Sequence, residues 1–318
     1  MNWGRGQGSG TGVLWLASLA LMAGTAHAAT TFYVTLSGLG GEPDYEQRFK
    51  MWADDIDGSL KKAGGDSKVF TLQAPTKDKV KAQFAEISRM AKPEDSLVVM
   101  LIGHGSYDGV DYKFNIPGPD ISGAELGGLL DRVPAGRQLV VVTTSSSGGA
   151  MESLRRANRI VISATKGGSE KNATMFGRFW AEALREPAAD TDKNEAVSAL
   201  EAFRYAQRKT TEFFDTQKRL ATEHSVLEDT GKGEGERDPK VENGQGKLAG
   251  SFSVVRIGAN AAAARDPNKR ALLDKKEQIE NAIDKLKYEK AAMNEADYKK
   301  QLTTLLVELA KTQEALEK

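Results

Sequence analysis

Residues 97–106 read LVVMLIGHGS, an uninterrupted apolar run that ends abruptly in Gly-His-Gly-Ser. A run with no polar alternation is typical of a strand that is buried on both faces, as in a parallel sheet. A second apolar run, Leu139 to Val142, leads into Thr-Thr-Ser-Ser-Ser-Gly-Gly at 143–149. Ligands bind at the carboxyl ends of the strands in such sheets, so we expect a functional site in these two loops.

Strands and helices alternate along the chain around these two runs. Further strands are expected at Thr31–Ser37, Lys68–Leu72, Arg159–Ser163 and Ser251–Ile257. Helices are expected from Tyr45, after caps at Thr76 and Ser122, from Asn172, and over Ala196–Leu220, with a short hairpin at Tyr107–Ile116. This alternation predicts an α/β fold with a mostly parallel six-stranded sheet and helices on both faces.

The N-terminus has the features of an export signal. Arg5 supplies a positive charge, Val13 to Met22 is a short apolar run, and Ala26-His27-Ala28 is a small-x-small cleavage site. The apolar run is short for a bilayer span, so a retained anchor is the weaker alternative. We therefore expect residues 1–28 to be a signal peptide and the mature chain to begin at Ala29, in the periplasm or outside the cell.

Composition narrows the possible chemistry. The 318 residues include 44 basic and 44 acidic side chains, and this balance gives no reason to expect nucleic acid as the main partner. No later segment is apolar enough for a stable membrane span. The chain contains no cysteine, which excludes a thiol nucleophile, thiolate metal sites and a disulfide framework.

The C-terminal part differs in character from the rest. Residues 259–265 are rich in alanine and are interpreted as a linker after an α/β domain at 29–258. Residues 266–318 carry leucine and isoleucine at a helical period, which predicts a helical hairpin or a coiled coil that could form an oligomer. The polar, glycine-rich stretch from Glu228 to Gly246 is expected to be a mobile surface loop.

The two strand-end loops resemble those of the caspase-like fold shared by caspases, legumains and gingipain-type peptidases. In that group a His-Gly follows the third strand, and the nucleophilic cysteine follows the fourth in a stretch like Asp-Ala-Cys-x-Ser-Gly. The resemblance covers about Phe32 to Ile257 in element order, although only the two loop motifs are specific. It implies a caspase-like α/β domain with a peptide-binding site at these loops.

Residue by residue, the resemblance assigns roles at both loops. His104 matches the catalytic histidine, Gly105 the residue whose amide helps form the oxyanion hole, and Ser145 the position of the cysteine. The residues implied to line a substrate pocket are Gly103, Ser147, Gly148, Ser163 and Ala164.

This sequence departs from the family at the reactive position itself. Ser145 replaces the cysteine, and Thr143 stands where an aspartate is expected. A hydroxyl needs a general base in contact with it, whereas a thiolate forms readily near neutral pH. We therefore favour a pseudopeptidase that binds a peptide or protein. One alternative is a serine hydrolase with a Ser145/His104 dyad. Another is that these serines and glycines only form hydrogen bonds within ordinary turns. A third is a structural envelope protein that acts through its helical tail.

A second candidate site lies in the acidic segment 190–201. Its spacing is similar to that of an EF-hand loop, with candidate calcium ligands at Asp190, Asp192, Asn194, Ser198 and Glu201. Position six of such a loop requires a positive φ and is normally glycine, but here it is Glu195. The alternative is an acidic cap on the following helix. No cofactor is required by this interpretation, and calcium is the possible ion.

Overall fold

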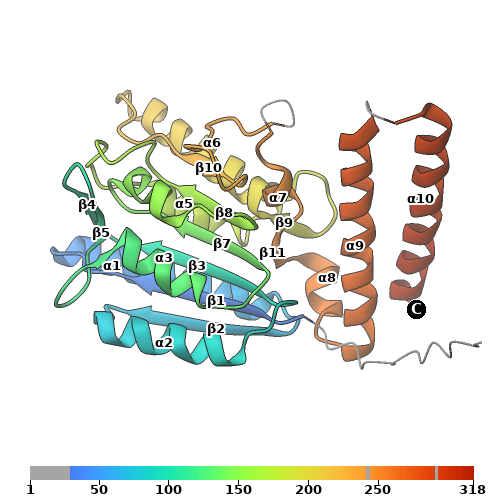
Figure 1. Ribbon diagram of the computed structural model, residues 1–318, viewed down its shortest axis with the longest axis horizontal. Helices are drawn as coiled ribbons and strands as arrows, with labels where there is room; N and C mark the ends of the chain where they lie inside the picture. Colours follow the sequence, from blue (N-terminus) through green and yellow to red (C-terminus); the bar gives the residue numbers. More distant parts are fainter. Residues whose placement is uncertain (1–28, 241–243, 291–292) are drawn as a thin grey trace, which may run out of the picture.

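The computed structural model describes residues 29–240, 244–290 and 293–318, so the expected signal peptide lies outside the described residues. The centre of the fold is a six-stranded sheet in the order β10-β8-β7-β3-β1-β2 (Figure 1). Its strands are β1 Thr31–Ser37, β2 Ser67–Gln73, β3 Ser96–Ile102, β7 Arg137–Val142, β8 Arg159–Ser163 and β10 Val226–Glu228. The first five are mutually parallel and β10 is antiparallel to β8. The expected α/β class and mostly parallel six-stranded sheet are confirmed.

Helices cover both faces of the sheet because the central strands are apolar on both sides. One face packs on α1 Pro43–Lys62, α5 Phe176–Ala183 and α6 Ala199–Thr216. The other packs on α2 Lys77–Met90, α3 Gly123–Asp131 and α4 Met151–Leu154. A small sheet of β4 Gly105–Tyr107, β5 Tyr112–Phe114 and β6 Ile121–Ser122 stands at the end of β3. Short helical turns occupy Ser147–Ala150, Pro187–Ala189 and Lys247–Gly250.

The strand expected at Ser251–Ile257 forms, but it does not belong to the six-stranded sheet. β11, Ser253–Arg256, pairs with β9, Ala196–Ser198, in a separate two-stranded sheet. The sixth strand of the main sheet is β10, inside the stretch that composition predicted to be a mobile loop. Glu228, at the end of β10, is fully buried, and its carboxylate accepts hydrogen bonds from four backbone amides, those of Thr230, Gly231, Lys232 and Gly233. These bonds compensate for burying a charge, so the prediction of a mobile loop is wrong at its beginning.

Three element boundaries also differ from the sequence-based expectation. α5 begins at Phe176 rather than Asn172. α6 begins only at Ala199, because Ala196–Ser198 pairs with β11 and Ser198 caps the helix through a capping box with Glu201. The expected linker is mostly helical, as α8, Gly258–Ala263, and the carbonyl of Ala264 after it accepts a hydrogen bond from the Gly65 amide. The alanines that suggested a linker are strong helix formers.

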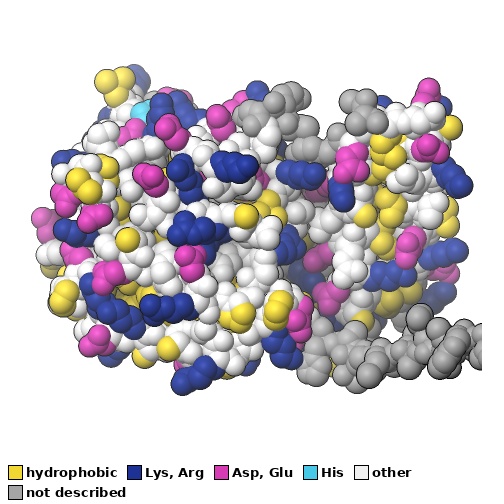
Figure 2. Space-filling view, viewed as in Figure 1, with side chains coloured by type: hydrophobic (Ala, Val, Ile, Leu, Met, Phe, Trp, Pro, Cys, Tyr) yellow, Lys and Arg dark blue, Asp and Glu magenta, His cyan; other side chains and the backbone are white. Residues whose placement is uncertain are grey.

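The C-terminal segment is a helical hairpin of α9, Pro267–Glu289, and α10, Glu295–Glu317. In Figure 1, α9 (orange) faces the α/β domain and α10 (red) lies on its far side. In the space-filling view of Figure 2, hydrophobic side chains are visible along the hairpin, and charges of both signs are interspersed over this face of the molecule. Within the described ranges, none of the helices combines the length and the apolar character needed to cross a bilayer.

Candidate functional site

The two loops singled out by the sequence lie side by side at one edge of the sheet. β3 and β7 are parallel neighbours in register, with Leu101 opposite Val142, and β8 is the next strand along. The chain therefore leaves all three strands at the same edge. We call the segments 103–106 and 143–149 the strand-end rim.

Ser145 is bonded to the opposite loop rather than to a base. Its hydroxyl donates to the carbonyl oxygen of Gly105 at 3.0 Å and accepts from the Gly105 amide at 3.2 Å. A serine has a single O–H donor, so its proton is committed to that carbonyl. The Gly105 amide, expected to stabilise an oxyanion, is likewise occupied. Ser145 is buried, with 4% of its surface exposed.

His104 lies in an aromatic environment on the α1 side of the rim. Its ring meets Tyr45 edge-on at 4.8 Å and Phe49 edge-on at 5.0 Å between centroids. Burial lowers the pKa of the imidazole below its ordinary value, partly offset by a hydrogen bond to the Gly40 backbone. Among the described residues, no hydrogen bond joins His104 to Ser145. The imidazole is therefore held neutral near pH 7 without contact to the hydroxyl that it would have to activate.

Three of the residues expected to line a pocket, Ser147, Gly148 and Ser163, are hydrogen-bonded to Thr165. The Ser147 hydroxyl accepts from the Thr165 amide at 3.0 Å, and the Gly148 amide donates to the Thr165 hydroxyl at 2.9 Å. Ser163 donates to the carbonyl of Thr165, and the Ala164 amide to the carbonyl of Val142. Gly103 takes no part in these bonds and is buried beside Phe114, with φ at +152°. Thr165, at the centre of this network, lies one residue beyond the pocket positions that the resemblance implies.

Two tyrosines of the small sheet close the front of the rim. The hydroxyl of Tyr112 is hydrogen-bonded to that of Thr144 at 2.6 Å, and burial raises the pKa of this phenol. The Tyr107 ring packs directly against the backbone of Gly149 and Gly168. The rim is therefore well packed, and Ser106 is the one exposed residue among 103–106 and 143–149, all of which the structure describes.

Ser146, the residue after Ser145, has an uncommon conformation. Its φ is +56°, in the left-handed region, and its side chain is fully buried. Among the described residues its hydroxyl has no hydrogen-bond partner. A non-glycine residue in this region is held there by its surroundings, and such residues cluster at functional sites. The amide of Ser146 donates to the carbonyl of Glu170 at 2.8 Å, which fixes the turn from outside.

Glu170 also connects the rim to His224, the last histidine of the chain. The Glu170 carboxylate bonds the His224 ring nitrogen Nδ1 at 2.5 Å and the His224 amide at 3.1 Å. The His224 side chain is only 34% exposed. The segment after α6 therefore folds back toward the rim. A separation of 54 residues between the partners left no local signal in the sequence.

Glu223, next to His224, gives a testable pH dependence. Its carboxylate is buried at the start of α5, where it accepts from the amides of Met175 and Phe176, and burial raises its pKa to about 7. The folded protein thus holds a proton that the unfolded chain releases above about pH 4.3. This contribution to stability is complete below that pH and is lost as the pH rises to 7.

We expect Glu223 to contribute a fall of about 2 kcal/mol in the free energy of unfolding between about pH 5 and pH 8, measured as the difference between the wild type and Glu223→Gln. Urea unfolding of both proteins at the two pH values measures the difference. His104 acts in the opposite direction, because its lowered pKa makes the folded state gain stability as the pH rises through its unfolded value. It is common to both proteins and cancels in the comparison. Equal pH dependence in the two proteins would contradict the assignment.

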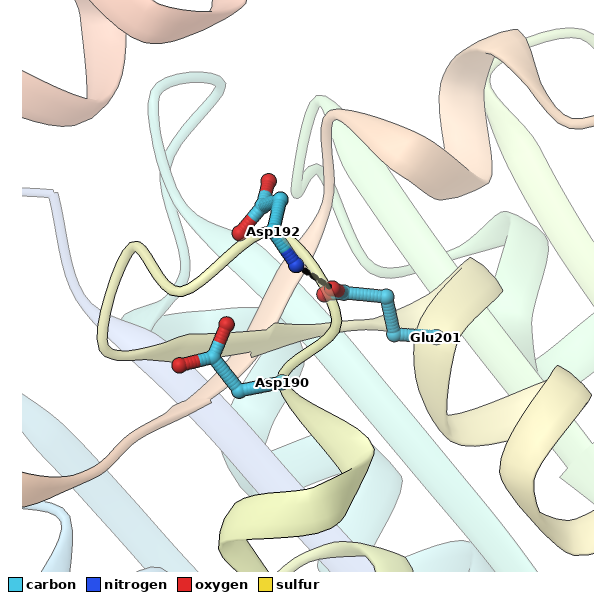
Figure 3. A group of neighbouring side chains, drawn as sticks. All are labelled: Asp190, Asp192 and Glu201. Atoms are coloured by element: carbon cyan, nitrogen blue, oxygen red, sulfur yellow. Dashed lines mark hydrogen bonds between the residues drawn. The ribbon is translucent and has the colours of Figure 1, made fainter.

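The acidic loop before α6 has part of the geometry expected of a calcium loop. Carboxylate oxygens of Asp190, Asp192 and Glu201 all lie within 4.8 Å of one another, and Glu195 does take the positive φ of position six, at +64°. Figure 3 shows Glu201 reaching from α6 to the loop, where it accepts from the Asp192 amide.

The same oxygens already have partners. Asp190 accepts from the amides of Asn194 and Glu195, and Glu201 accepts from the Ser198 amide and hydroxyl. Asn194 uses its side-chain oxygen on the Ala196 amide. These bonds account for the cluster as a helix cap and turn, and calcium binding stays a prediction.

No protein-family description and no curated protein matches this chain. Solved structures similar in fold include caspase-1 from Spodoptera frugiperda, at 13% identity and a TM-score of 0.47 over 64% of this chain and 88% of that one. The Drosophila initiator caspase Dronc matches at 10% identity and a TM-score of 0.45, over 64% of this chain and 80% of that one. A Geobacter sulfurreducens protein matches at 14% identity and a TM-score of 0.40, over 57% of this chain and 89% of that one. The likeness to caspases expected from the loop motifs is present, and at these values it says nothing of activity.

Proposed function

We propose that this chain is an exported, caspase-like pseudopeptidase that binds a peptide or protein segment at the strand-end rim without cleaving it. The proposal depends on one observation: the Ser145 hydroxyl both donates to and accepts from the backbone of Gly105. A serine nucleophile requires a base in hydrogen-bond contact, and the neutral His104 is instead held between Tyr45 and Phe49. Binding needs no such contact.

The exposed residue of β4 supplies the recognition element in this proposal. β4 pairs with β5 on one side only, because it is the outer strand of the small sheet. At its other edge the Gly105 amide and carbonyl are bonded to the Ser145 hydroxyl, so a bound segment contacts the exposed side chain of this strand rather than extending the sheet. Ser106 is the exposed residue of β4, so its side chain lies where a bound segment would pass.

Two measurements test the proposal against the serine-hydrolase alternative. We expect a fluorophosphonate probe to leave Ser145 unlabelled by intact-mass analysis. We also expect a peptide selected from a random phage-displayed library to bind Ser145→Ala within about twofold of the wild type. Ser106→Trp, which fills the surface at the exposed position of β4, should weaken binding of that peptide about tenfold or more. Labelling that disappears in Ser145→Ala would instead establish the hydrolase.

A further inference from the structure

A groove runs between α1 and α5, on the face of the sheet opposite α2 and α3. It has a volume of about 590 Å³ and a floor of Met51, Trp52, Met175 and Phe213. Met51 is 51% exposed, which is unusual for so apolar a side chain. An exposed methionine beside aromatic rings is adaptable and suits the burial of a large apolar group from a ligand.

Some of the charged side chains around this floor have polar partners and others have none among the described residues. Arg185 is paired with Asp55 at 2.7 Å, and Glu182 accepts from the Tyr205 hydroxyl at 2.6 Å. Both acidic groups of the groove therefore have partners already. Arg48 and Arg178 form no ion pair within the described part of the chain, and their guanidinium groups rest over the rings of Tyr45 and Phe179.

An arginine stacked on a ring keeps its N–H donors free and its orientation restricted. Such a guanidinium is well prepared for bidentate binding of a carboxylate. Arg48 lies on α1 and Arg178 on α5, so the two cations stand on opposite walls of the groove, with the apolar floor between them. The complementary ligand has carboxylates on both sides of one large apolar side chain.

We propose that the α1–α5 groove binds a short acidic segment of a partner protein through an apolar anchor on Met51 and Phe213 and carboxylates on Arg48 and Arg178. This site is separate from the strand-end rim, and the proposal does not depend on the rim being a binding site. It assigns a role to two arginines that stabilise no ion pair in the described fold.

The experiment uses the full chain and a fluorescein-labelled peptide of sequence Asp-Glu-Phe-Glu-Asp in fluorescence anisotropy. We expect saturable binding that weakens about tenfold or more in the double variant Arg48→Glu/Arg178→Glu. Arg89→Glu, an exposed arginine in the last turn of α2 on the other face, is the matched control and should stay within about twofold. Replacing the central phenylalanine of the peptide with alanine should weaken binding about tenfold or more, because the anchor is lost.

Both arginines are exposed, so these variants should fold, and the thermal midpoint checks this. Met51→Glu provides an independent test, since it places a negative charge on the floor and should weaken binding as strongly. Ser106→Trp should leave this peptide unaffected, which separates the groove from the rim. The proposal is overturned if no saturable binding occurs, if the arginine variants bind normally, or if an oligothymidylate binds as well as the peptide.

Discussion

Gly105→Ala is expected to lower the free energy of unfolding by about 3 kcal/mol, because it forces apart the two turns of the strand-end rim. A Cβ at this position would lie 2.7 Å from the carbonyl oxygen of Ser145 and 2.6 Å from the Tyr112 ring. The first of these is backbone and cannot rotate away. Displacing it also breaks both hydrogen bonds between Gly105 and the Ser145 hydroxyl.

Gly128→Ala is the matched control for this prediction. Gly128 lies inside α3, and a Cβ there would meet nothing within 4 Å. The same substitution should therefore raise the free energy of unfolding by about 0.5–1 kcal/mol, since alanine favours the helix. If the turns are packed as described, urea unfolding will show a lower free energy of unfolding for Gly105→Ala and a higher one for Gly128→Ala than for the wild type. A neutral Gly105→Ala would show that the turns are further apart.

Much of the sheet could be predicted from the sequence because its central strands carry their own signal. The runs ending at Ile102 and Val142 have no polar residue to suggest any other element. β10 carries no such signal, since it has three residues and ends in a glutamate. Its carboxylate accepts hydrogen bonds from backbone amides that follow it in the chain. Composition does not reveal these bonds, so the polar, glycine-rich stretch is predicted to be a solvent-exposed loop.

The candidate site, like the sheet, could be predicted only in part from the sequence. The adjacency of the Gly103 and Thr143 turns follows from parallel pairing of two buried strands, so the sequence was sufficient to predict it. The direction of the Ser145 hydroxyl depends on atoms of Gly105 placed to within a few tenths of an ångström, which no residue pattern encodes. The support from Glu170 and Glu223 comes from long-range contacts, to the His224 ring and to the backbone amides of Met175 and Phe176, which leave no local pattern in the sequence.

Replacement of Arg256 by methionine should release the helical hairpin from the α/β domain. Arg256 on β11 donates to Glu277 at 2.7 Å and to Asp274 at 2.7 Å, and both acceptors lie on α9. Its side chain is only 16% exposed. The substitution leaves two carboxylates close together and partly buried without a cation, a situation that costs about 3 kcal/mol.

The measurement for Arg256→Met is trypsin cleavage after Arg265, at the start of α9, followed by mass spectrometry. A loss of that size raises the open population, and with it the cleavage rate, roughly 100-fold when reclosing is fast. Lys275→Met is the control, because Lys275 pairs with Glu308 within the hairpin and both side chains are half exposed; such a pair contributes at most about 1 kcal/mol. Adding Asp274→Asn and Glu277→Gln to Arg256→Met should restore part of the protection, since the uncompensated charges are then gone. Equal cleavage of Arg256→Met and Lys275→Met would mean that the apolar contacts of α8 and α9, rather than Arg256, hold the hairpin in place.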